Sequence, residues 1–267
     1  MHYKAQETLF FYIIAFIFVL VLFFGLIGVI HLWLLGRAKR EDTEVSASKF
    51  IAALLKTSLF QTQILEYSIL AWWAHLFISF GFLALLMLTA FHFALMWLVP
   101  SSSDIFHYFT SGKGNLILAV WGDFWGLALL VGVILAMFRR YILRPKQLNT
   151  ISDDSIAILF LLVVTVSGFL CEAVRLAARP QAADFAYSFA VNWAASLLEP
   201  YKLSESIVEL FFWLHGAISF LFLAYIPFSK YRHIFTSPFV YALITSNSQY
   251  TKDGRLERNC HGELQEV

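Results

Sequence analysis

Charged side chains are scarce in this sequence. Asp, Glu, Lys and Arg make up 14% of its 267 residues, whereas 60% of the residues are hydrophobic and 28 are Phe. A soluble domain of this length needs a charged coat, and the chain lacks the residues to form one. The net charge of +1 leaves no overall basic field, so nothing indicates a nucleic-acid partner.

Cysteine is nearly absent, and the catalytic motifs of soluble enzymes are missing. The two cysteines are Cys171, inside an apolar run, and Cys260, in the polar tail. Two cysteines placed in this way do not form a disulfide framework, and the absence of a CxxC motif gives no sign of a zinc or iron–sulfur site within the chain. The sequence contains no nucleophile motif, no metal-hydrolase motif and no nucleotide-binding loop. Nothing therefore indicates bond-making chemistry by the chain's own side chains.

Long apolar runs are abundant. A helix needs about 20 apolar residues to cross the hydrocarbon core of a bilayer. Five runs qualify: 8–35, 69–99, 115–138, 155–177 and 206–228. The first run is too long, and too weakly basic at its start, for a cleaved signal peptide. The predicted fold class is an all-α integral membrane protein with five transmembrane helices. Residues 1–245 form the membrane domain, and residues 246–267 form a flexible cytoplasmic tail.

The basic residues are distributed unequally between the two sides of the predicted bundle. Fourteen of the nineteen Lys and Arg residues fall in segments 36–68, 139–154 and the tail from 229, and five fall on the other side. The positive-inside rule places the larger group in the cytoplasm, so we expect the N-terminus outside and the C-terminus in the cytoplasm. Segment 49–65 is moderately apolar but charged, which favours a short interfacial helix over a sixth span.

Four histidines occupy comparable positions on two predicted helices. His75 and His92 lie early and late in the 69–99 run, His215 lies early in the 206–228 run, and His233 lies just past its end. Ionisable residues inside a membrane are costly and usually face a cofactor, a cavity or a partner. Two histidines on each of two antiparallel helices indicate two bis-histidine haems.

The spacing of these histidines supports the pairing. His75 and His92 are 17 residues apart and His215 and His233 are 18 apart, which corresponds to about 25 Å and about 27 Å of helix. Because the helices are antiparallel, we expect His75 to face His233 near the cytoplasmic surface, and His92 to face His215 near the outer surface. Eighteen residues complete five turns, so His215 and His233 point the same way, whereas His75 and His92 differ by roughly 100°.

Each histidine also has a simpler interpretation as a packing or interfacial residue. Four histidines at matching depths favour haem, whereas His31 lacks a partner at its depth and is expected to be interfacial. A solvated side chain is the default for the three histidines in aqueous segments, His2, His107 and His261. Gly81 and Gly216 would give a macrocycle room beside the backbone, but small residues in membrane helices also serve simple packing.

Four stretches carry a family resemblance: LLKTSLFQTQILEYSILAWWAHLFISFGF, then WGDFWGLALLVGVILAMFRRYILRPKQL with DD following, then GFLCEAVRLA, and WLHGAISFLFLAYIPFSKYRHIFTSP. Together they resemble the gamma-subunit family of respiratory nitrate reductase. The similarity is to its heterodisulfide-reductase-like branch, which includes the E subunit of heterodisulfide reductase and the M subunit of the sulfite-reduction-associated membrane complex. The resemblance covers nearly the whole chain from about residue 50 to 240, and the last stretch is its most specific part.

The resemblance implies two b-type haems and a quinone site, with menaquinone as the expected quinone. It implies a cytoplasmic iron–sulfur partner similar to the catalytic subunit of heterodisulfide reductase. It also implies His215 and His233 as ligands on the last helix, and His75 as the first ligand on the second. The sequence departs from the family at the fourth ligand, because the stretch SFGFLALLMLT contains no histidine where the family has one. His92, two turns further on and on a similar face, is assigned as the fourth ligand.

Polar residues at the two predicted haem levels have competing interpretations. Asp123, Glu172 and Arg175 lie at the outer level, where an acidic group near a quinol hydroxyl would accept a proton, so they are the candidate quinone site. Alternatively, Glu172 and Arg175 form an ion pair, and Asp123 bonds a neighbouring helix or caps a helix end. The inner level carries four basic residues: Arg139, Arg140, Arg144 and Lys230. They are expected to contact either haem propionates or anionic lipid.

The sequence therefore predicts a di-haem cytochrome b subunit of a respiratory oxidoreductase in the cytoplasmic membrane of a prokaryote. The subunit would contact membrane lipid and the iron–sulfur subunit, and further membrane or outer-side electron-transfer subunits would complete the complex. The alternative is a haem-free small transporter or assembly factor. Transporters often show broken helices and inverted repeats, and the sequence shows neither.

Overall fold

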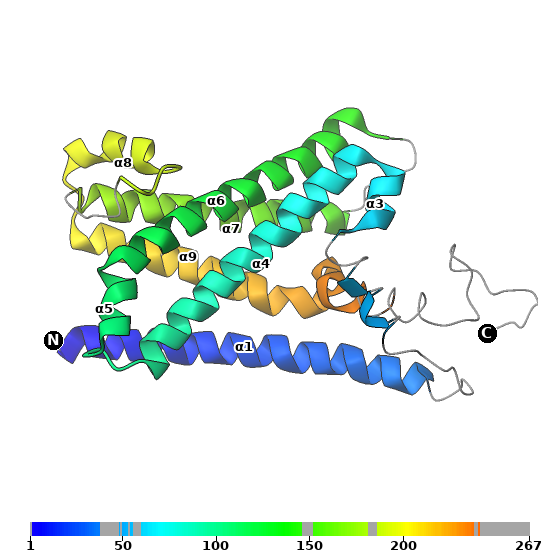
Figure 1. Ribbon diagram of the computed structural model, residues 1–267, viewed down its shortest axis with the longest axis horizontal. Helices are drawn as coiled ribbons and strands as arrows, with labels where there is room; N and C mark the ends of the chain where they lie inside the picture. Colours follow the sequence, from blue (N-terminus) through cyan, green and yellow to red (C-terminus); the bar gives the residue numbers. More distant parts are fainter. Residues whose placement is uncertain are drawn as a thin grey trace, which may run out of the picture. The chain divides into compact units, whose positions relative to one another are not determined.

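The computed structural model describes residues 2–37, 60–145, 152–180 and 186–237, together with positions 48, 50–52, 54–55 and 240. Within these residues the chain is helical and has no strand (Figure 1). Five helices are long and apolar enough to cross a membrane: Ile13–Leu32, Ile69–Leu98, Lys113–Leu143, Ser152–Ala177 and Glu205–Phe228. The predicted fold class is confirmed, and the chain is a multi-pass membrane protein.

Residues 73–222 form one compact unit that carries most of four spans. Its elements are α4 (Ile69–Leu98, from Trp73 on), α5 (Asp104–Thr110), α6 (Lys113–Met137), α7 (Ser152–Ala177), α8 (Asn192–Leu198), η2 (Glu199–Tyr201) and α9 (Glu205–Tyr225, up to Phe222). α6 continues as the π-helical turn η1 (Phe138–Leu143). That turn ends at Arg144, whose φ of 44° is left-handed, directly before Pro145.

Glycines allow α4 and α6 to pack backbone to backbone. A Cβ on Gly81 of α4 would lie 2.9 Å from both the Leu129 nitrogen and the Trp125 carbonyl oxygen of α6. A Cβ on Gly132 of α6 would lie 2.8 Å from the Ile78 nitrogen of α4. Close approach of this kind is the usual role of small residues between membrane helices. Of the two interpretations of Gly81, helix packing is the one that these contacts support.

Successive spans of this unit run in opposite directions. For α4 and α6, Gly81 lies against Leu129, whereas Ile78, earlier in α4, lies against Gly132, later in α6. These two helices are therefore antiparallel. For α6 and α7, Arg140 near the end of one contacts Asp154 near the start of the other, with Nη1 and Oδ2 2.6 Å apart. The ring of Phe169, later in α7, lies 2.9 Å from the position of a Cβ on Gly126, earlier in α6. α6 and α7 are therefore antiparallel.

Two contacts order α7 against α9 in the same way. Ser167 of α7 meets His215 of α9, with Oγ and Nδ1 2.9 Å apart, and Phe160 meets Phe222, with ring centroids 5.3 Å apart. Three antiparallel steps, from α4 through α6 and α7 to α9, make α4 and α9 antiparallel. The predicted relative direction of the two histidine-bearing helices is thus observed within this unit.

The second compact unit comprises residues 1–72 and 223–267. Its described elements are α1 (His2–Arg37), α3 (Thr62–Tyr67), the first residues of α4, the last residues of α9, and the 3-10 turns η3 (Ile226–Phe228) and η4 (Lys230–Arg232). α1 packs on η3 through Gly25, where a Cβ would lie 2.6 Å from ring carbons of Pro227. α1 therefore contacts the segment that leads to His233.

The helix does not continue from His215 to His233, which corrects the register expected between these two residues. α9 ends at Tyr225, and η3 and η4 follow, separated by Ser229 in an extended conformation (φ −119°, ψ −179°). Pro227 has no N–H to continue the helical ladder. The expected five-turn register between His215 and His233, and their separation of about 27 Å along one helix, are therefore wrong. The assignment of both as ligands stays a prediction.

The predicted interfacial helix over 49–65 is interrupted where the structure describes it. Positions 50–52 and 54–55 are helical, but Gln61 has a left-handed φ of 48°, and α3 starts after it. The Trp72 indole N–H bonds the Phe60 carbonyl oxygen at 2.8 Å, which ties this turn to the start of α4. The tail over 246–267 lies outside the described residues, and the division of the chain at residue 245 stays a prediction.

Candidate functional site

His92 lies late in α4 with its side chain partly buried. Its Nδ1 atom is 3.0 Å from the carbonyl oxygen of Leu88, one turn earlier. A carbonyl oxygen only accepts hydrogen bonds, so Nδ1 must carry the proton and donate it. Nε2 is then the nitrogen with the lone pair, which is the form in which a neutral imidazole ligates a metal.

His215 is held against α7. Its Nδ1 atom is 2.9 Å from the Ser167 hydroxyl oxygen, which also lies 2.9 Å from the Val164 carbonyl oxygen. A Cβ on Gly168 would lie 3.2 Å from Cε1 of the imidazole, so the missing side chain lets the ring lie against the α7 backbone. On its other side, Nε2 is 3.4 Å from the hydroxyl oxygen of Ser219.

The other two candidate ligands engage the same ring nitrogen. In residues 73–222, Nδ1 of His75 lies 3.2 Å from the Ser79 hydroxyl oxygen. In the second unit, Nδ1 of His233 donates to the carbonyl oxygen of Lys230. Burial raises the pKa of the neighbouring Tyr231 phenol, which keeps it neutral. The facing of His75 and His233 stays a prediction.

This donor set fits haem iron. Nδ1 of a metal-ligating histidine normally bonds an oxygen, which fixes the tautomer and orients the ring. Iron bound through Nε2 would leave all four Nδ1 contacts in place. The described residues contain no cluster of three or more His, Cys, Asp or Glu side chains able to hold a bare metal ion. A bis-histidine haem needs only two imidazoles for each iron.

An aromatic layer lies between the levels of His75 and His92 on α4. The Phe222 ring of α9 contacts Phe82 of α4 and Phe160 of α7, with centroid distances of 5.8 and 5.3 Å. His215 lies seven residues before Phe222 in α9, and His92 lies ten residues after Phe82 in α4. Because the two helices are antiparallel, both steps lead in the same direction away from the layer. Along their own helices these steps are about 10.5 Å for His215 and about 15 Å for His92. Both imidazoles therefore lie on the same side of this layer.

Two acidic residues bind the segment that precedes α8. Asp123 is buried, and its Oδ2 atom accepts the backbone N–H of Ala190 at 2.7 Å. Glu172 accepts Nε and Nη2 of Arg175 at 2.8 and 2.6 Å. The hydroxyl of buried Ser188 also donates to Glu172 Oε1, at 3.4 Å. The ion pair considered from the sequence is thus present. Asp123 bonds the turn before α8 rather than a neighbouring helix, and the quinone role of these residues stays a prediction.

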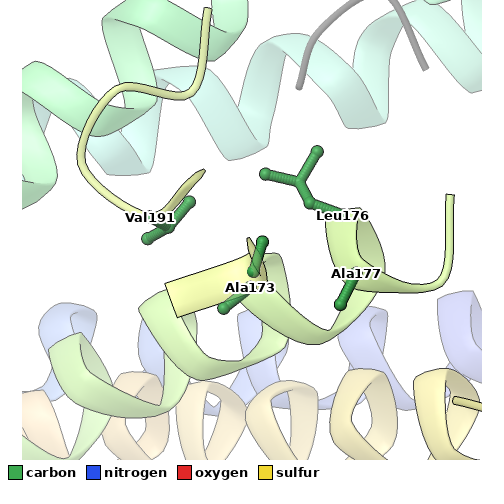
Figure 2. Close-up of a cluster of buried hydrophobic side chains, with 5 residues drawn as sticks. Ala173, Leu176, Ala177 and Val191 are labelled. Carbon is green, nitrogen blue, oxygen red and sulfur yellow. The ribbon is translucent and has the colours of Figure 1, made fainter. Parts of the chain in front are cut away.

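The segment that precedes α8, and α8 itself, pack on α7 mainly through small side chains. Ala173, Leu176 and Ala177 of α7 pack with Val191 and Ala195 in a buried cluster (Figure 2). The ends of α6 and α7 that carry Asp123, Glu172 and this cluster are called the α8 end below. The contacts of Ser188, Val191 and Ser167 were missed from the sequence. The available signals were the small polar residues within or beside a span, which often mark helix contacts.

At the opposite end of α6, Arg140 is compensated within the chain. Its Nη1 atom lies 2.6 Å from Asp154 Oδ2, with side-chain exposures of 15% and 11%. The Nη1 hydrogens are not aligned with this oxygen in hydrogen-bond geometry, so the contact is an ion pair. Arg140 is therefore paired with a carboxylate of α7. The expected role in holding a propionate stays a prediction for Arg139, Arg140, Arg144 and Lys230.

Comparison with known proteins identifies relatives over most of the chain. An EtfAB:quinone oxidoreductase of Syntrophomonas wolfei is 30% identical over 240 residues, which cover 85% of this chain and 32% of that protein. The E subunit of the dihydromethanophenazine:CoB–CoM heterodisulfide reductase of Methanosarcina acetivorans is 27% identical, covering 76% of this chain and 69% of that relative. An Hdr-like menaquinol oxidoreductase cytochrome b-like subunit of Archaeoglobus fulgidus is 29% identical, covering 52% and 41%.

The chain thus spans about a third of the length of the Syntrophomonas protein and about two thirds of the Methanosarcina protein. No solved structure matches the chain. The family described as Nitrate reductase gamma subunit matches residues 55–252, a segment that includes the four candidate histidines and excludes α1. With three quarters of its sequence inside that match, the chain belongs to the nitrate reductase gamma subunit family.

Proposed function

We propose that the chain is a membrane-anchored di-haem cytochrome b subunit of a respiratory oxidoreductase. His75 and His233 would hold one haem, and His92 and His215 the other. The observation that carries the proposal is that each of these histidines engages Nδ1 with an oxygen atom. Where Nδ1 donates, as it does to the carbonyl oxygens beside His92 and His233, Nε2 keeps the lone pair that would bind iron. When bound, the two b-type haems supply one-electron transfer. Membership of the nitrate reductase gamma subunit family supports the same function.

The proposed quinone site, with menaquinone as the expected quinone, is at the α8 end. Quinol oxidation releases protons, and the Glu172 carboxylate is the group proposed to accept one. Asp123 is proposed to shape the site by holding the Ala190 amide. Arg175 is proposed to hold the Glu172 carboxylate in place through its two hydrogen bonds. The printed names of two relatives, a menaquinol oxidoreductase subunit and a quinone oxidoreductase, support a quinone as substrate.

The proposed electron partner is a cytoplasmic iron–sulfur subunit similar to the catalytic subunit of heterodisulfide reductase. The names of the relatives from Methanosarcina and Archaeoglobus support it, since both belong to heterodisulfide reductase or a similar complex. The location is the cytoplasmic membrane of a prokaryote, and further membrane or outer-side subunits complete the complex. Quinol oxidation and quinone reduction are both compatible with this arrangement.

The purified chain is expected to carry two low-spin, six-coordinate b-type haems. The expected number is two because each of the two proposed histidine pairs would hold one haem. A pyridine haemochrome assay against protein concentration measures it, with the Soret band as a visible check. A ratio near one would remove His92 from the ligands. A colourless protein would overturn the function and favour the haem-free transporter or assembly factor.

The basic ends of the helices are expected to face the cytoplasm. A reporter that is active only in the cytoplasm should be active when fused after residue 150 or at the C-terminus, and silent when fused near residue 105. The physical reason is that fourteen of nineteen Lys and Arg residues lie in the first group of segments. The reverse pattern of reporter activity would put the iron–sulfur docking face on the wrong side.

A further inference from the structure

Ser167 sits within a span, and the position of its single hydroxyl proton can be deduced. A serine hydroxyl has one donor proton and two acceptor lone pairs. Its oxygen lies 2.9 Å from the Val164 carbonyl oxygen, which has no proton to offer, so the hydroxyl donates there. The 2.9 Å contact with His215 Nδ1 must then run the other way, with Nδ1–H donating to Ser167. Nδ1 of His215 therefore carries a proton.

We propose that Ser167 is a positioning residue for haem ligation by His215. By accepting Nδ1–H, it fixes the tautomer and the ring orientation in which Nε2 is the axial ligand. The opposite arrangement, with Ser167 donating to Nδ1, would put the imidazole proton on Nε2 and block that nitrogen. The inference rests on the proposed function, because it concerns how one of the four histidines meets iron.

The contact between Ser167 and His215 Nδ1 joins two helices, unlike the Nδ1 contacts of the other three histidines. Nδ1 of His75, of His92 and of His233 bonds an atom three or four residues away on the same segment, so these Nδ1 contacts move with the histidine. Ser167 lies 48 residues from His215, on a different helix. Gly168, beside it, provides the space that the ring occupies against α7. α7 thus fixes both the position and the rotation of an imidazole carried by α9.

The hydrogen bond should also tune the haem. An acceptor at Nδ1–H raises the basicity of the imidazole, which makes Nε2 a stronger electron donor and favours ferric iron. Removing the acceptor is expected to raise the midpoint potential of the haem held by His215. The potential of the haem proposed to be held by His75 and His233 should not change, because the bond from Ser167 goes to a ligand of the other haem.

The experiment compares Ser167→Ala with Ser167→Thr and Thr165→Ala in the full-length chain. Potentiometric titration followed in the haem α band, with the ferric electron paramagnetic resonance spectrum, reads both haems without a turnover assay. Thr165 is the matched control, since its buried hydroxyl bonds the Leu161 carbonyl oxygen at 2.8 Å in the same helix. Thr at position 167 keeps a hydroxyl that can accept Nδ1–H.

Ser167→Ala should raise one midpoint potential and shift the spectrum of one low-spin haem, while Ser167→Thr and Thr165→Ala titrate like wild type. If Ser167→Ala instead loses one haem, retention of two haems in Ser167→Thr supports the positioning role. Wild-type chain with two haems and an unchanged Ser167→Ala titration would overturn this inference alone. A haem-free wild-type chain would overturn the proposed function as well.

Discussion

His215→Ala should purify with one haem per chain instead of two, and quinol should no longer reduce the haem that remains. The His215 imidazole would hold the haem beside the proposed quinone site, and alanine has no atom to replace Nε2. The loss of a six-coordinate haem should appear as half the wild-type haemochrome absorbance per chain. Stopped-flow mixing with a menaquinol analogue measures the second effect. The expected residual rate is about the uncatalysed rate, because the proposed entry point for electrons is gone.

His107→Ala is the matched control for this variant. His107 is exposed on α5, outside the five spans, and is expected to be solvated. Its removal should leave two haems and the wild-type rate. His92→Ala tests the pairing, because it should remove the same spectral component as His215→Ala. If His215→Ala keeps two low-spin haems, the four-histidine assignment is wrong.

The His92→Ala variant is the most informative test, because the sequence departs from its family at the fourth ligand. From the Phe82–Phe222 contact, His215 lies seven residues along α9 and His92 lies ten residues along α4. These steps differ by about 4.5 Å of helix, before the inclination of α4 to α9 is counted (Figure 1). A haem lost in His215→Ala but kept in His92→Ala would mean that another side chain supplies the fourth ligand.

The spans could be predicted from the sequence because they depend on local composition alone. Any apolar run of sufficient length must be helical in lipid, where each backbone group needs an internal partner. The sequence predicts five such runs, and the part of the chain that the structure describes contains five spans. Their relative directions followed from the count of spans. Pro227 is a local signal for the end of the last helix. The predicted register between His215 and His233 assumed a continuous helix across this proline.

The contacts between spans could not be predicted in this way. Whether Ser167 faces His215 or lipid depends on how α7 is rotated about its axis, and a helix that is apolar on most sides gives little information on rotation. The same holds for Asp123, where a capping role and a quinone role both fit the sequence. The bond to Ala190 depends on the path of a segment 67 residues further along the chain. The pairing of Arg140 with Asp154 likewise required the packing of two helix ends.

The second large effect is expected at the α8 end, where Glu172→Gln should slow haem reduction by a menaquinol analogue by about 10²-fold, the lower range for loss of a positioned proton acceptor. Asp123→Asn should slow it less. Asparagine keeps a carbonyl oxygen for the Ala190 amide, so the variant removes the charge while preserving the bond to the segment before α8. Both haem spectra should stay intact, because neither residue contacts a candidate ligand. Stopped-flow absorbance in the haem α band gives the rate.

Glu172→Gln also leaves Arg175 without its two carboxylate contacts, so the slowing needs a control that separates the two effects. The double change Glu172→Gln with Arg175→Gln removes both charges, and it should be as slow as the single variant if the carboxylate accepts the proton. Recovery in the double variant would assign the defect to the unpaired arginine. Glu205→Gln, an exposed carboxylate beside Arg179, should reduce at the wild-type rate. If both acidic variants reduce normally, while changes at Arg140 or Lys230 slow the reaction, the quinone binds at the opposite end. Proton release would then fall on the side of the basic residues, where it would not add to the charge separated by inward electron transfer.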